Sequence, residues 1–550
     1  MRHERRHRRG LLLAAIAVVA LTTASDPSAT STSSAVREGG IFRISLPVQA
    51  GLDNMDPALS FTPPGWALLD TVCARLMAYP DKRPPAGLRL QPEVAVAPPT
   101  VSRDLKTFTF RLRENFRFSD GNPVRASAFA RAINRTLAPS MKSPGALFTR
   151  HIVGAGEVLT GKRRTASGVM ARGYTLIVRF TRAAPDFPAL TTLPFFCAVP
   201  PALPLDNEGI GVFPTAGPYR VTEYRPGERV LIRRNPFYGG ARPHHVDGFD
   251  VDLRAPSPDE PIRRIERGEA DWTTNLIPIF LNPALGLVER YGINRSRFFS
   301  QRGLALRMLA FNSSRPLFRN NPALRRAVNF ALDRRALQAI GGGPLGGRLT
   351  DQYLPPLVPG FHDGDVYPLE QADPVRARRL ARDNLRGGKA VFYTGDFGFP
   401  LAVAQLAKQQ LSALGLEVEI KPLPVHTGSA AYLDLLAKPG AEWDIALVVW
   451  TPNLPDPQAY LNLLLDSHHV GGTNVAGFTS ATYDHALRRA ARVPQARQRQ
   501  LAYGSLDVQV ARHAAPFAAL TVLNEPTFVS ERVGCIVLRP TLVLTSVCLK

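Results

Sequence analysis

Alternating hydrophobic and polar residues mark the first clear strands of the chain. Over residues 107–118 the apolar side chains recur with a period of two, at Phe108, Phe110, Leu112, Phe116 and Phe118. This period is that of a strand with one buried face, and Glu114-Asn115 provides a turn before Phe116 and Phe118 continue that face. The Ser-Asp-Gly-Asn-Pro segment at residues 119–123 ends the strand, and a four-residue apolar period through residue 137 then predicts a helix. A hairpin is predicted over residues 219–234, because the Pro-Gly pair at its centre suits a tight turn.

After residue 303 the pattern changes to alternating strands and helices. Apolar, strand-like runs occupy residues 304–312, 390–393, 416–420 and 444–450. Asn321-Pro322 and Asp373-Pro374 each supply a capping side chain followed by proline at the first helical position, which indicates a helix start. Strand–helix–strand units joined by short loops predict a mixed α/β lobe. Residues 519–529 return to the alternation of a hairpin.

The first 24 residues have the pattern of a signal peptide. A basic segment precedes an apolar stretch at residues 11–21, and small residues follow it. The stretch is short for a bilayer span, although retention as an uncleaved anchor is left open. Arg8-Arg9 permits a twin-arginine route, and the absence of a cysteine after the apolar stretch argues against a lipid anchor. We therefore expect an exported protein, in the periplasm or at the outer face of the cytoplasmic membrane, with a flexible Ser/Thr-rich tether at residues 25–38.

Length and charge narrow the classes of function. A chain of 550 residues exceeds what one hydrophobic core supports, so two or more lobes are expected. The net charge is +22, but the arginines are scattered, and the dense basic run at residues 2–9 lies within the signal segment. A nucleic-acid-binding protein concentrates its basic residues on one helix or stripe. We therefore expect no nucleic-acid partner.

Four cysteines allow three disulfide pairings in an exported protein. Cys535 and Cys548 flank a predicted C-terminal hairpin, which favours a bridge between them, and Cys73 with Cys197 is then the complementary pair. The other pairings remain open. None of the four lies in a Cys-x-x-Cys or Cys/His spacing, so no metal site is expected.

The chain carries no motif that points to catalysis. Residues 156–163 approach the phosphate-loop pattern but lack its final hydroxyl, and the glycines of residues 341–347 follow a helix where a dinucleotide fingerprint follows a strand. The adjacent pairs His244-His245 and His468-His469 are poorly spaced to chelate one metal ion. Neither a Gly-x-Ser-x-Gly elbow nor a His-Glu-x-x-His motif occurs. We expect no enzyme activity and no cofactor, and an exported hydrolase is the weakest of the alternatives.

Five stretches resemble the family 5 extracytoplasmic peptide- and nickel-binding receptors of ABC importers. They are TFTFRLRENFRFSDGNPVRASAFARAINRTL at 107–137, TAGPYRVTEYRPGERVLIRRNPFYGG at 215–240, RIERGEADW at 264–272, LAFNSSRPLFRNNPALRRAVNFALDRRAL at 309–337 and WDIALVVWTPNLPDPQAYL at 443–461. The matches keep the family's order and extend over roughly residues 40 to 530. Together they form a specific signal, whereas each alone is weak.

The resemblance implies an α/β, two-lobed, periplasmic-binding-protein-like clamp of type II, with mixed sheets in each lobe and a discontinuous first lobe. The expected divisions are residues 39–302 for the first lobe, including the family's extra subdomain, 303–518 for the second lobe, and 519–550 for the return to the first. The implied function is capture of a peptide or similar small solute between the lobes and its delivery to an ABC permease by a monomeric receptor. The alternative is a sensor or scaffold with the same fold that does not deliver to a transporter.

The resemblance also suggests residues that hold the ligand. They are Trp450, Asn453, Asp456, Trp272, Asp53 and Asn54. Trp450 resembles a tryptophan that lines the family's binding sites, although packing explains it equally well. Peptide-binding members place an aspartate, which pairs with the ligand's α-amino group, at the position of Asn453. Because asparagine lacks the opposite charge, this departure weakens the expectation of a free-amine peptide.

Overall fold

The computed structural model describes residues 38–48, 51–274, 281–425 and 427–550. The signal segment and nearly all of the predicted tether lie outside these residues and stay predictions. No helix in the described ranges combines the length and the apolar character that a membrane crossing requires.

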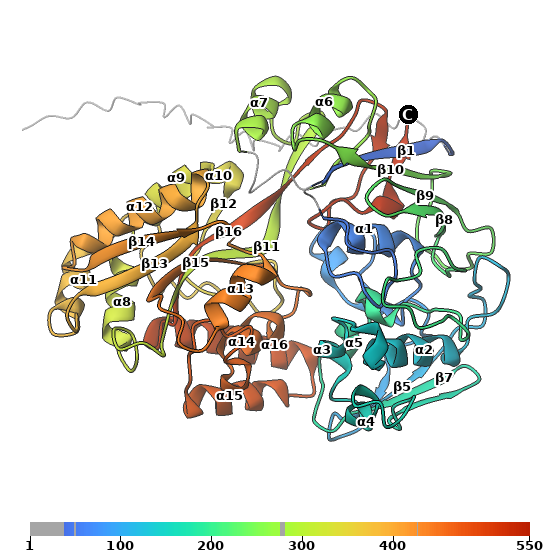
Figure 1. Cartoon of the computed structure of the whole chain (residues 1–550), viewed down its shortest axis with the longest axis horizontal. Coiled ribbons are helices and arrows are strands. Elements are labelled where there is room, and N and C mark those ends of the chain that lie inside the picture. Colours follow the sequence, from blue (N-terminus) through green and yellow to red (C-terminus); the bar gives the residue numbers. More distant parts are fainter. Residues whose placement is uncertain (1–37, 49–50, 275–280, 426) are drawn as a thin grey trace, which may run out of the picture. The chain divides into compact units, whose positions relative to one another are not determined.

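A four-stranded sheet forms one part of the first lobe (Figure 1). Its strands, in spatial order, are β1 (Ile41–Pro47), β10 (Gly248–Ala255), β9 (Arg229–Arg234) and β8 (Tyr219–Arg225). β1 runs parallel to β10, and the other neighbours are antiparallel. β8 and β9 form the hairpin predicted over residues 219–234, with Gly227 at a φ of +72° in its turn. The sheet's apolar face packs with helix α1 (Pro63–Val72) in one core.

A second four-stranded sheet forms a subdomain with its own core. Its strands are β4 (Thr100–Val101), β5 (Thr107–Arg111), β7 (Thr175–Arg179) and β6 (Val169–Arg172), and its helices are α2 (Ala126–Leu137), α3 (Ala146–Thr149), α4 (Ala155–Leu159) and α5 (Phe187–Leu190). The turn expected at Glu114-Asn115 is present, and within the element predicted over residues 107–118 the regular strand is β5. Its ladder ends at Arg111 because the partner strand begins at Thr175, directly after a turn at Gly173.

A six-stranded mixed sheet organises the second lobe. Its strands, in spatial order, are β12 (Gly347–Leu349), β16 (Phe517–Phe528), β11 (Phe298–Phe311), β15 (Ile445–Trp450), β13 (Lys389–Gly395) and β14 (Glu417–Leu423). The helices that follow Asn321 along the chain are α8 (Pro322–Ala331), α9 (Arg334–Ile340), α10 (Gly343–Gly346), α11 (Pro374–Ala381), α12 (Gly398–Ser412), α13 (Ala430–Ala437), α14 (Gln458–Leu465), α15 (Ala481–Ala491) and α16 (Ala496–His513). Figure 1 shows α9 and α12 above the strands and α14 to α16 below them. The parallel strands β14, β13 and β15 end at the same edge of the sheet.

The chain crosses between the lobes along β11 and β16, which are antiparallel partners over most of their length (Figure 1). Phe298 and Phe528, at one end of this pair, pack with helices α6 (Glu260–Glu266) and α7 (Leu281–Tyr291). The other end lies within the second-lobe core. After β16 the chain forms β17 (Val533–Cys535) and β18 (Cys548–Leu549), whose residues join the first-lobe core. The boundaries predicted at 302/303 and 518/519 fall within β11 and β16 and stay predictions.

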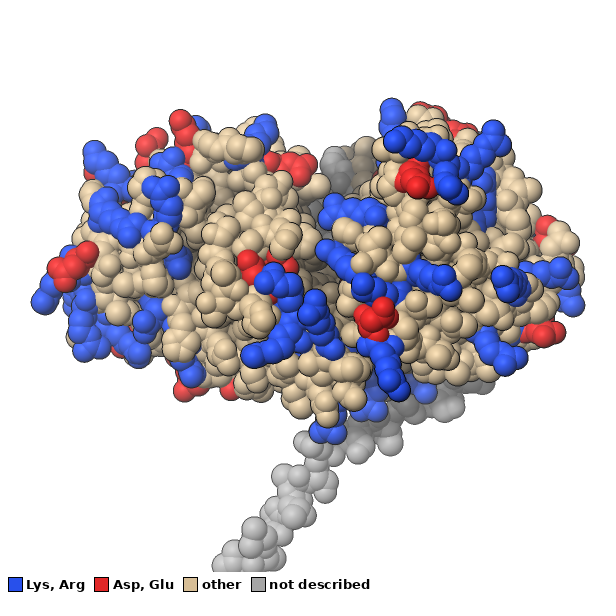
Figure 2. All heavy atoms as spheres, turned by 90° about the horizontal axis from the view of Figure 1, so that it is seen from below, with Lys and Arg blue, Asp and Glu red and all other residues tan. Residues whose placement is uncertain are grey.

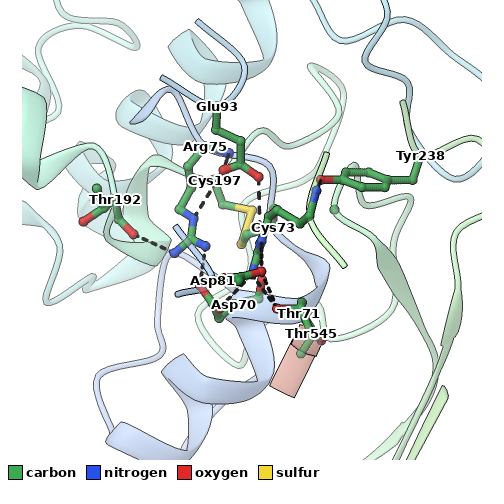
Figure 3. Close-up of polar contacts among 12 residues, drawn as sticks. Asp70, Thr71, Cys73, Arg75, Asp81, Glu93, Thr192, Cys197, Tyr238 and Thr545 are labelled. Carbon is green, nitrogen blue, oxygen red and sulfur yellow. Dashed lines mark hydrogen bonds and ion pairs between the residues drawn. A yellow bond between two sulfur atoms is a disulfide. The ribbon is translucent and has the colours of Figure 1, made fainter. Parts of the chain in front are cut away.

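Buried charges join the C-terminal segment to the first lobe. Asp70, Asp81 and Glu93 converge beside the Cys73–Cys197 disulfide (Figure 3). Arg242 reaches Asp70 at 2.7 Å and Asp81 at 3.3 Å, and the C-terminal Thr545 donates to Asp81 at 2.7 Å. Burial opposes ionisation of Asp70, yet the positive charges of Arg242 and Arg75 outweigh burial and lower the pKa of Asp70. Arg539 of the C-terminal segment pairs with Asp81 at 3.3 Å, so a charge pair as well as apolar packing holds the return of the chain to the first lobe.

The structure forms two disulfides, Cys73–Cys197 and Cys535–Cys548, which is the pairing that the sequence favours. The first links the end of α1 to a segment 124 residues further along the chain. The second joins β17 to β18 across a separation of 13 residues.

Candidate functional site

Segments of both lobes line one cavity, which we call the interlobe cavity. Its volume is about 1170 Å³. The first lobe contributes residues between 77 and 108 and between 185 and 189, and the second contributes the loop at 356–361, residues 455–456 and the start of α16. Proline, leucine and phenylalanine side chains make most of the wall, and a few polar groups interrupt it. This composition is typical of sites that enclose a small organic ligand.

Two carboxylates enter the interlobe cavity from different lobes. Asp186 directly precedes α5 of the first lobe, and Asp456 lies two residues before α14 of the second. Asp456 is held in place by the backbone N–H of Gln458, which donates to its Oδ1 at 2.9 Å. Burial, and then the negative charge of Asp456, raise the pKa of Asp186 to about 6. Burial also raises the pKa of Asp456.

The two acids are the groups of the cavity that can attract a positive charge, and Arg89, Arg103 and Arg499 line the cavity as well. Like charges that share a poorly hydrated space repel, and either a proton or a cation relieves the repulsion. Arg499, which also lines the cavity, lowers the pKa of both acids without restoring it to its ordinary value. Tyr79 adds a neutral phenol, because burial and the nearby Asp456 raise its pKa. The arrangement can bind an ammonium or guanidinium group and offers it hydrogen-bonding neighbours.

Of the expected ligand residues, the structure places Asp456 on the interlobe cavity. Trp450 ends β15 at 6 % exposure, and its indole N–H donates to the carbonyl of Ala459 in α14 at 3.0 Å. That contact gives Trp450 a packing role in the second-lobe core. Asn453 is partly buried in the loop between Trp450 and Asp456. The roles of these residues toward a ligand stay predictions.

The expected residues of the first lobe serve its internal structure. Asp53 accepts hydrogen bonds from the hydroxyls of Ser60 and Thr62, at 3.1 and 2.7 Å, and so closes its own loop. The Asn54 amide donates to the carbonyl of Glu208 at 2.9 Å. Trp272, 6 % exposed, lies in the core between Ile44 of β1 and Val529, the residue that follows β16. The structure therefore does not bring these residues together with Asp456.

Sequence reasoning missed Asp186 as a candidate residue. Its local signal is a short Pro-Asp-Phe-Pro segment, which is typical of a helix start and says nothing about a ligand. Its partner Asp456 lies 270 positions further along the chain, and their proximity arises only when the lobes meet.

The described ranges contain no group of three or more His, Cys, Asp or Glu side chains arranged to hold a metal ion. Figure 2 shows Lys and Arg side chains spread over the displayed face, with fewer Asp and Glu among them. The two acids of the interlobe cavity also have basic neighbours, since Arg89, Arg103 and Arg499 line the same cavity.

Comparison with known proteins assigns the family. The family model described as "Bacterial extracellular solute-binding proteins, family 5 Middle" matches residues 89–472. The chain belongs to this family. Both the interlobe cavity and the two crossings between lobes accord with a family of solute-binding proteins.

Relatives of this family 5 protein span most of its length. The periplasmic oligopeptide-binding protein OppA of Escherichia coli (strain K12) is 25% identical over 77% of this chain and 78% of that protein. The probable D,D-dipeptide-binding periplasmic protein DdpA of the same organism is 24% identical over 82% and 83%. The structure of the clavulanic acid biosynthesis oligopeptide binding protein 2 matches with a TM-score of 0.83 at 23% identity, covering 93% of this chain and 96% of that chain. The expected two-lobed α/β clamp with a discontinuous first lobe is confirmed.

Proposed function

We propose that this family 5 protein captures a peptide or a similar small solute in the interlobe cavity and delivers it to an ABC import permease. The observation that carries the proposal is the cavity itself, since residues of both lobes line it. Its volume of about 1170 Å³ exceeds the roughly 300–1,000 Å³ of common small-molecule sites, so it suits a ligand of several residues. The names of the relatives OppA and DdpA, an oligopeptide- and a dipeptide-binding protein, support the peptide class.

The chemistry of the cavity favours a ligand with a positively charged group. Asp186 and Asp456 come from opposite lobes, and a cation between them neutralises both while holding the lobes together. Asn453, in the loop between Trp450 and Asp456, carries no charge. Asp186 and Asp456 are therefore the residues that we expect to bind an amine.

The direct test is to identify the ligand. Mass spectrometry of protein purified under native conditions should detect co-purifying peptides or small solutes, and refolded protein should bind the identified compound by calorimetry. Peptides with a free α-amine should bind at least tenfold more tightly than their N-acetylated forms, because a charge-assisted contact contributes roughly 1.5–3 kcal/mol. Equal binding of both forms would overturn the role given to the acid pair.

A matched set of variants distinguishes the effect of the two cavity acids from a general effect of negative charge on the protein. D186N and D456N should each weaken binding of the free-amine ligand. E417Q removes an exposed carboxylate of the same type on β14, whose side chain is 77% exposed, and should leave affinity unchanged. If all three variants bind alike, the ligand does not contact the acid pair.

Delivery is a separate step with a separate test. Cells lacking this protein should lose uptake of the identified ligand, and a permease should be recovered with the ligand-bound protein after crosslinking. Normal uptake together with loss of a ligand-dependent signalling response would favour the sensor alternative. We propose a monomeric receptor without nucleic-acid partner or catalytic activity, and light scattering of the purified protein tests the first of these.

A further inference from the structure

Three arginines are buried in the second-lobe core, and they differ in their partners. Arg325, 4 % exposed, donates to the carbonyls of Phe318 and Ala514, and Arg334, fully buried, donates to several oxygens around Asn329. Arg307 is 3 % exposed, and among the described residues it has neither a hydrogen-bond acceptor nor a carboxylate partner; its Nε is buried without a hydrogen bond. A buried guanidinium without an acceptor is costly, since it has lost its hydration without replacement.

A second polar group without a partner lies beside Arg307. On β11, Arg307 is opposite Thr521 of β16, and residues opposite one another on antiparallel strands point to the same face of the sheet. The Thr521 hydroxyl is buried and has no hydrogen-bond partner in the described part of the chain. Two adjacent buried donors, both without acceptors, indicate a missing acceptor and not an isolated packing defect.

The N-terminus of helix α12 completes the surroundings. The guanidinium carbon of Arg307 lies 4.2 Å from the ring centroid of Phe399, the second residue of this 15-residue helix. Phe397 at the N-cap position supplies no side-chain cap, and the positive end of the helix dipole therefore adds to the positive charge of the arginine. A Cβ on Gly341 would lie 2.6 Å from the Arg307 Nη1, so glycine leaves room around the guanidinium.

We propose that Arg307, Thr521 and the first turn of α12 form a binding site for a small oxyanion, the carboxylate or phosphate group of a solute. A planar guanidinium donates two parallel hydrogen bonds to such a group, and the hydroxyl and the helix N-terminus favour the same negative charge. Burial lowers the pKa of Arg307 to about 9, and the guanidinium is still charged at neutral pH. The exposed residues 396–398 and the partly exposed Phe399 give access from solvent.

This site is distinct from the interlobe cavity, whose lining does not include Arg307. Neighbouring strand residues point to opposite faces, and Leu306 is the residue opposite Trp450. Trp450 contacts α14 on one side of the sheet, whereas Arg307 contacts α12 on the other. The inference therefore stands or falls independently of the proposed peptide ligand.

The test uses the full-length purified protein with acetate, succinate and inorganic phosphate as probes at constant ionic strength. In the wild-type protein at least one of them should raise the melting temperature saturably and bind by calorimetry. R307M should weaken that binding roughly tenfold to hundredfold, the loss expected for charge-assisted hydrogen bonds. R307K should bind with intermediate affinity, because it keeps the charge and loses the planar fork. Comparison of the affinities for succinate and for phosphate tells which oxyanion the site prefers.

A matched control distinguishes a ligand site from a structural role. R325M removes an equally buried arginine that has acceptors, so it should lower the melting temperature and leave the anion response intact. R307M without anion should melt at or above the wild-type temperature, because it removes an unpaired buried charge. The proposal is overturned if no probe binds saturably to the wild-type protein. It is also overturned if R307M binds the anions as the wild type does, or if R307M is destabilised as much as R325M.

Discussion

The ion pair between Arg135 and Asp56 is the best place to test how burial sets the strength of a charge interaction in this protein. Arg135 lies on α2, and its two terminal nitrogens donate to the two Asp56 oxygens at 2.8 and 2.6 Å. The two side chains are 1% and 0% exposed. Asp56 also accepts the backbone N–H groups of Ala58 and Ile210, so the pair joins three segments of the first lobe.

Replacement of Arg135 by methionine leaves a buried carboxylate with only neutral donors. Removal of one partner of a buried pair costs about 3–5 kcal/mol, mostly because the remaining charge is left uncompensated. The double variant D56N/R135M removes both charges and should cost clearly less than the sum of the single variants. The amount by which the summed losses of the two single variants exceed the loss in the double variant is the coupling energy between the two groups.

A matched exposed pair provides the control. Arg163 and Glu157 are also close, at 2.6 Å, but their side chains are 62% and 51% exposed. Exposed pairs contribute about 0–1 kcal/mol, because water already screens both charges. R163M should therefore change the free energy of unfolding by less than about 1 kcal/mol.

Urea denaturation, followed by circular dichroism and tryptophan fluorescence, measures these free energies. The first-lobe transition of R135M should shift to lower urea concentration, while the slope of the transition stays unchanged. If R135M and R163M lower the free energy of unfolding by the same amount, burial does not determine the strength of these ion pairs and the prediction is refuted.

Three further predictions concern the acid pair, the disulfide and the C-terminal charges. The pKa of Asp186 is raised to about 6, so the unfolded chain loses this proton at lower pH than the folded protein does. As the pH rises from about 4 to about 6, the wild-type free energy of unfolding should therefore fall relative to that of D186N by at most about 3 kcal/mol. Thermal melts across pH 4–8 measure the difference. Replacement of Cys73 and Cys197 by serine should lower the free energy of unfolding by up to about 5 kcal/mol, because the loop that this disulfide closes is long. Loss of the C-terminal disulfide, which closes a short loop, should lower it by about 3 kcal/mol. Denaturant titration measures both values, and an equal effect of the two losses would contradict the prediction. R242M removes one positive charge shared by Asp70 and Asp81 and should release residues 536–547 to limited proteolysis sooner than in the wild type. An unchanged cleavage rate would argue against a role of these charges in holding the C-terminus.

Elements specified by local chemistry were predictable from the sequence. The hairpin of β8 and β9 follows from its Pro-Gly turn, and the start of α8 follows from Asn321, whose side chain accepts from the N–H of Leu324. Both signals act over a few residues, so neither depends on the rest of the fold. The buried strand β15 was equally clear, because its continuous apolar run suits a sheet covered on both faces.

In the element predicted at residues 107–118 the turn at Glu114-Asn115 follows from the sequence, whereas the end of the β5 ladder does not. Its apolar alternation continues through Phe116 and Phe118, and both side chains are indeed buried, at 2% exposure. The ladder nevertheless ends at Arg111, because the neighbouring strand turns at Gly173. Periodicity reports which side chains are buried, whereas strand length depends on the partner.

The candidate site was harder to predict than the fold, because it depends on the direction of single side chains. Family resemblance identified the loop after Trp450 and so found Asp456, but it could not tell whether the tryptophan faces a ligand or the core. Asp186 and Arg307 carry no motif. Asp186 stands out because a second acid comes near it from the other lobe, and Arg307 because its neighbours lack acceptors. Both properties belong to the assembled core.

The positions of the two cavity acids connect charge recognition to lobe closure. Asp186 belongs to the first lobe and Asp456 to the second, and β11 and β16 are the strands that join these lobes. We expect separation of the lobes to move the carboxylates apart and to let water screen their repulsion, so that the repulsion between the two acids favours opening. A ligand shifts a conformational equilibrium only by its difference in affinity for the two states. A cation that contacts both acids satisfies this requirement, because both contacts exist only when the lobes are closed. A neutral ligand of the same size lacks that difference and leaves the repulsion in place. Closure of this receptor should therefore respond to the charge of the solute, and acidic pH should partly replace the cation by protonating Asp186.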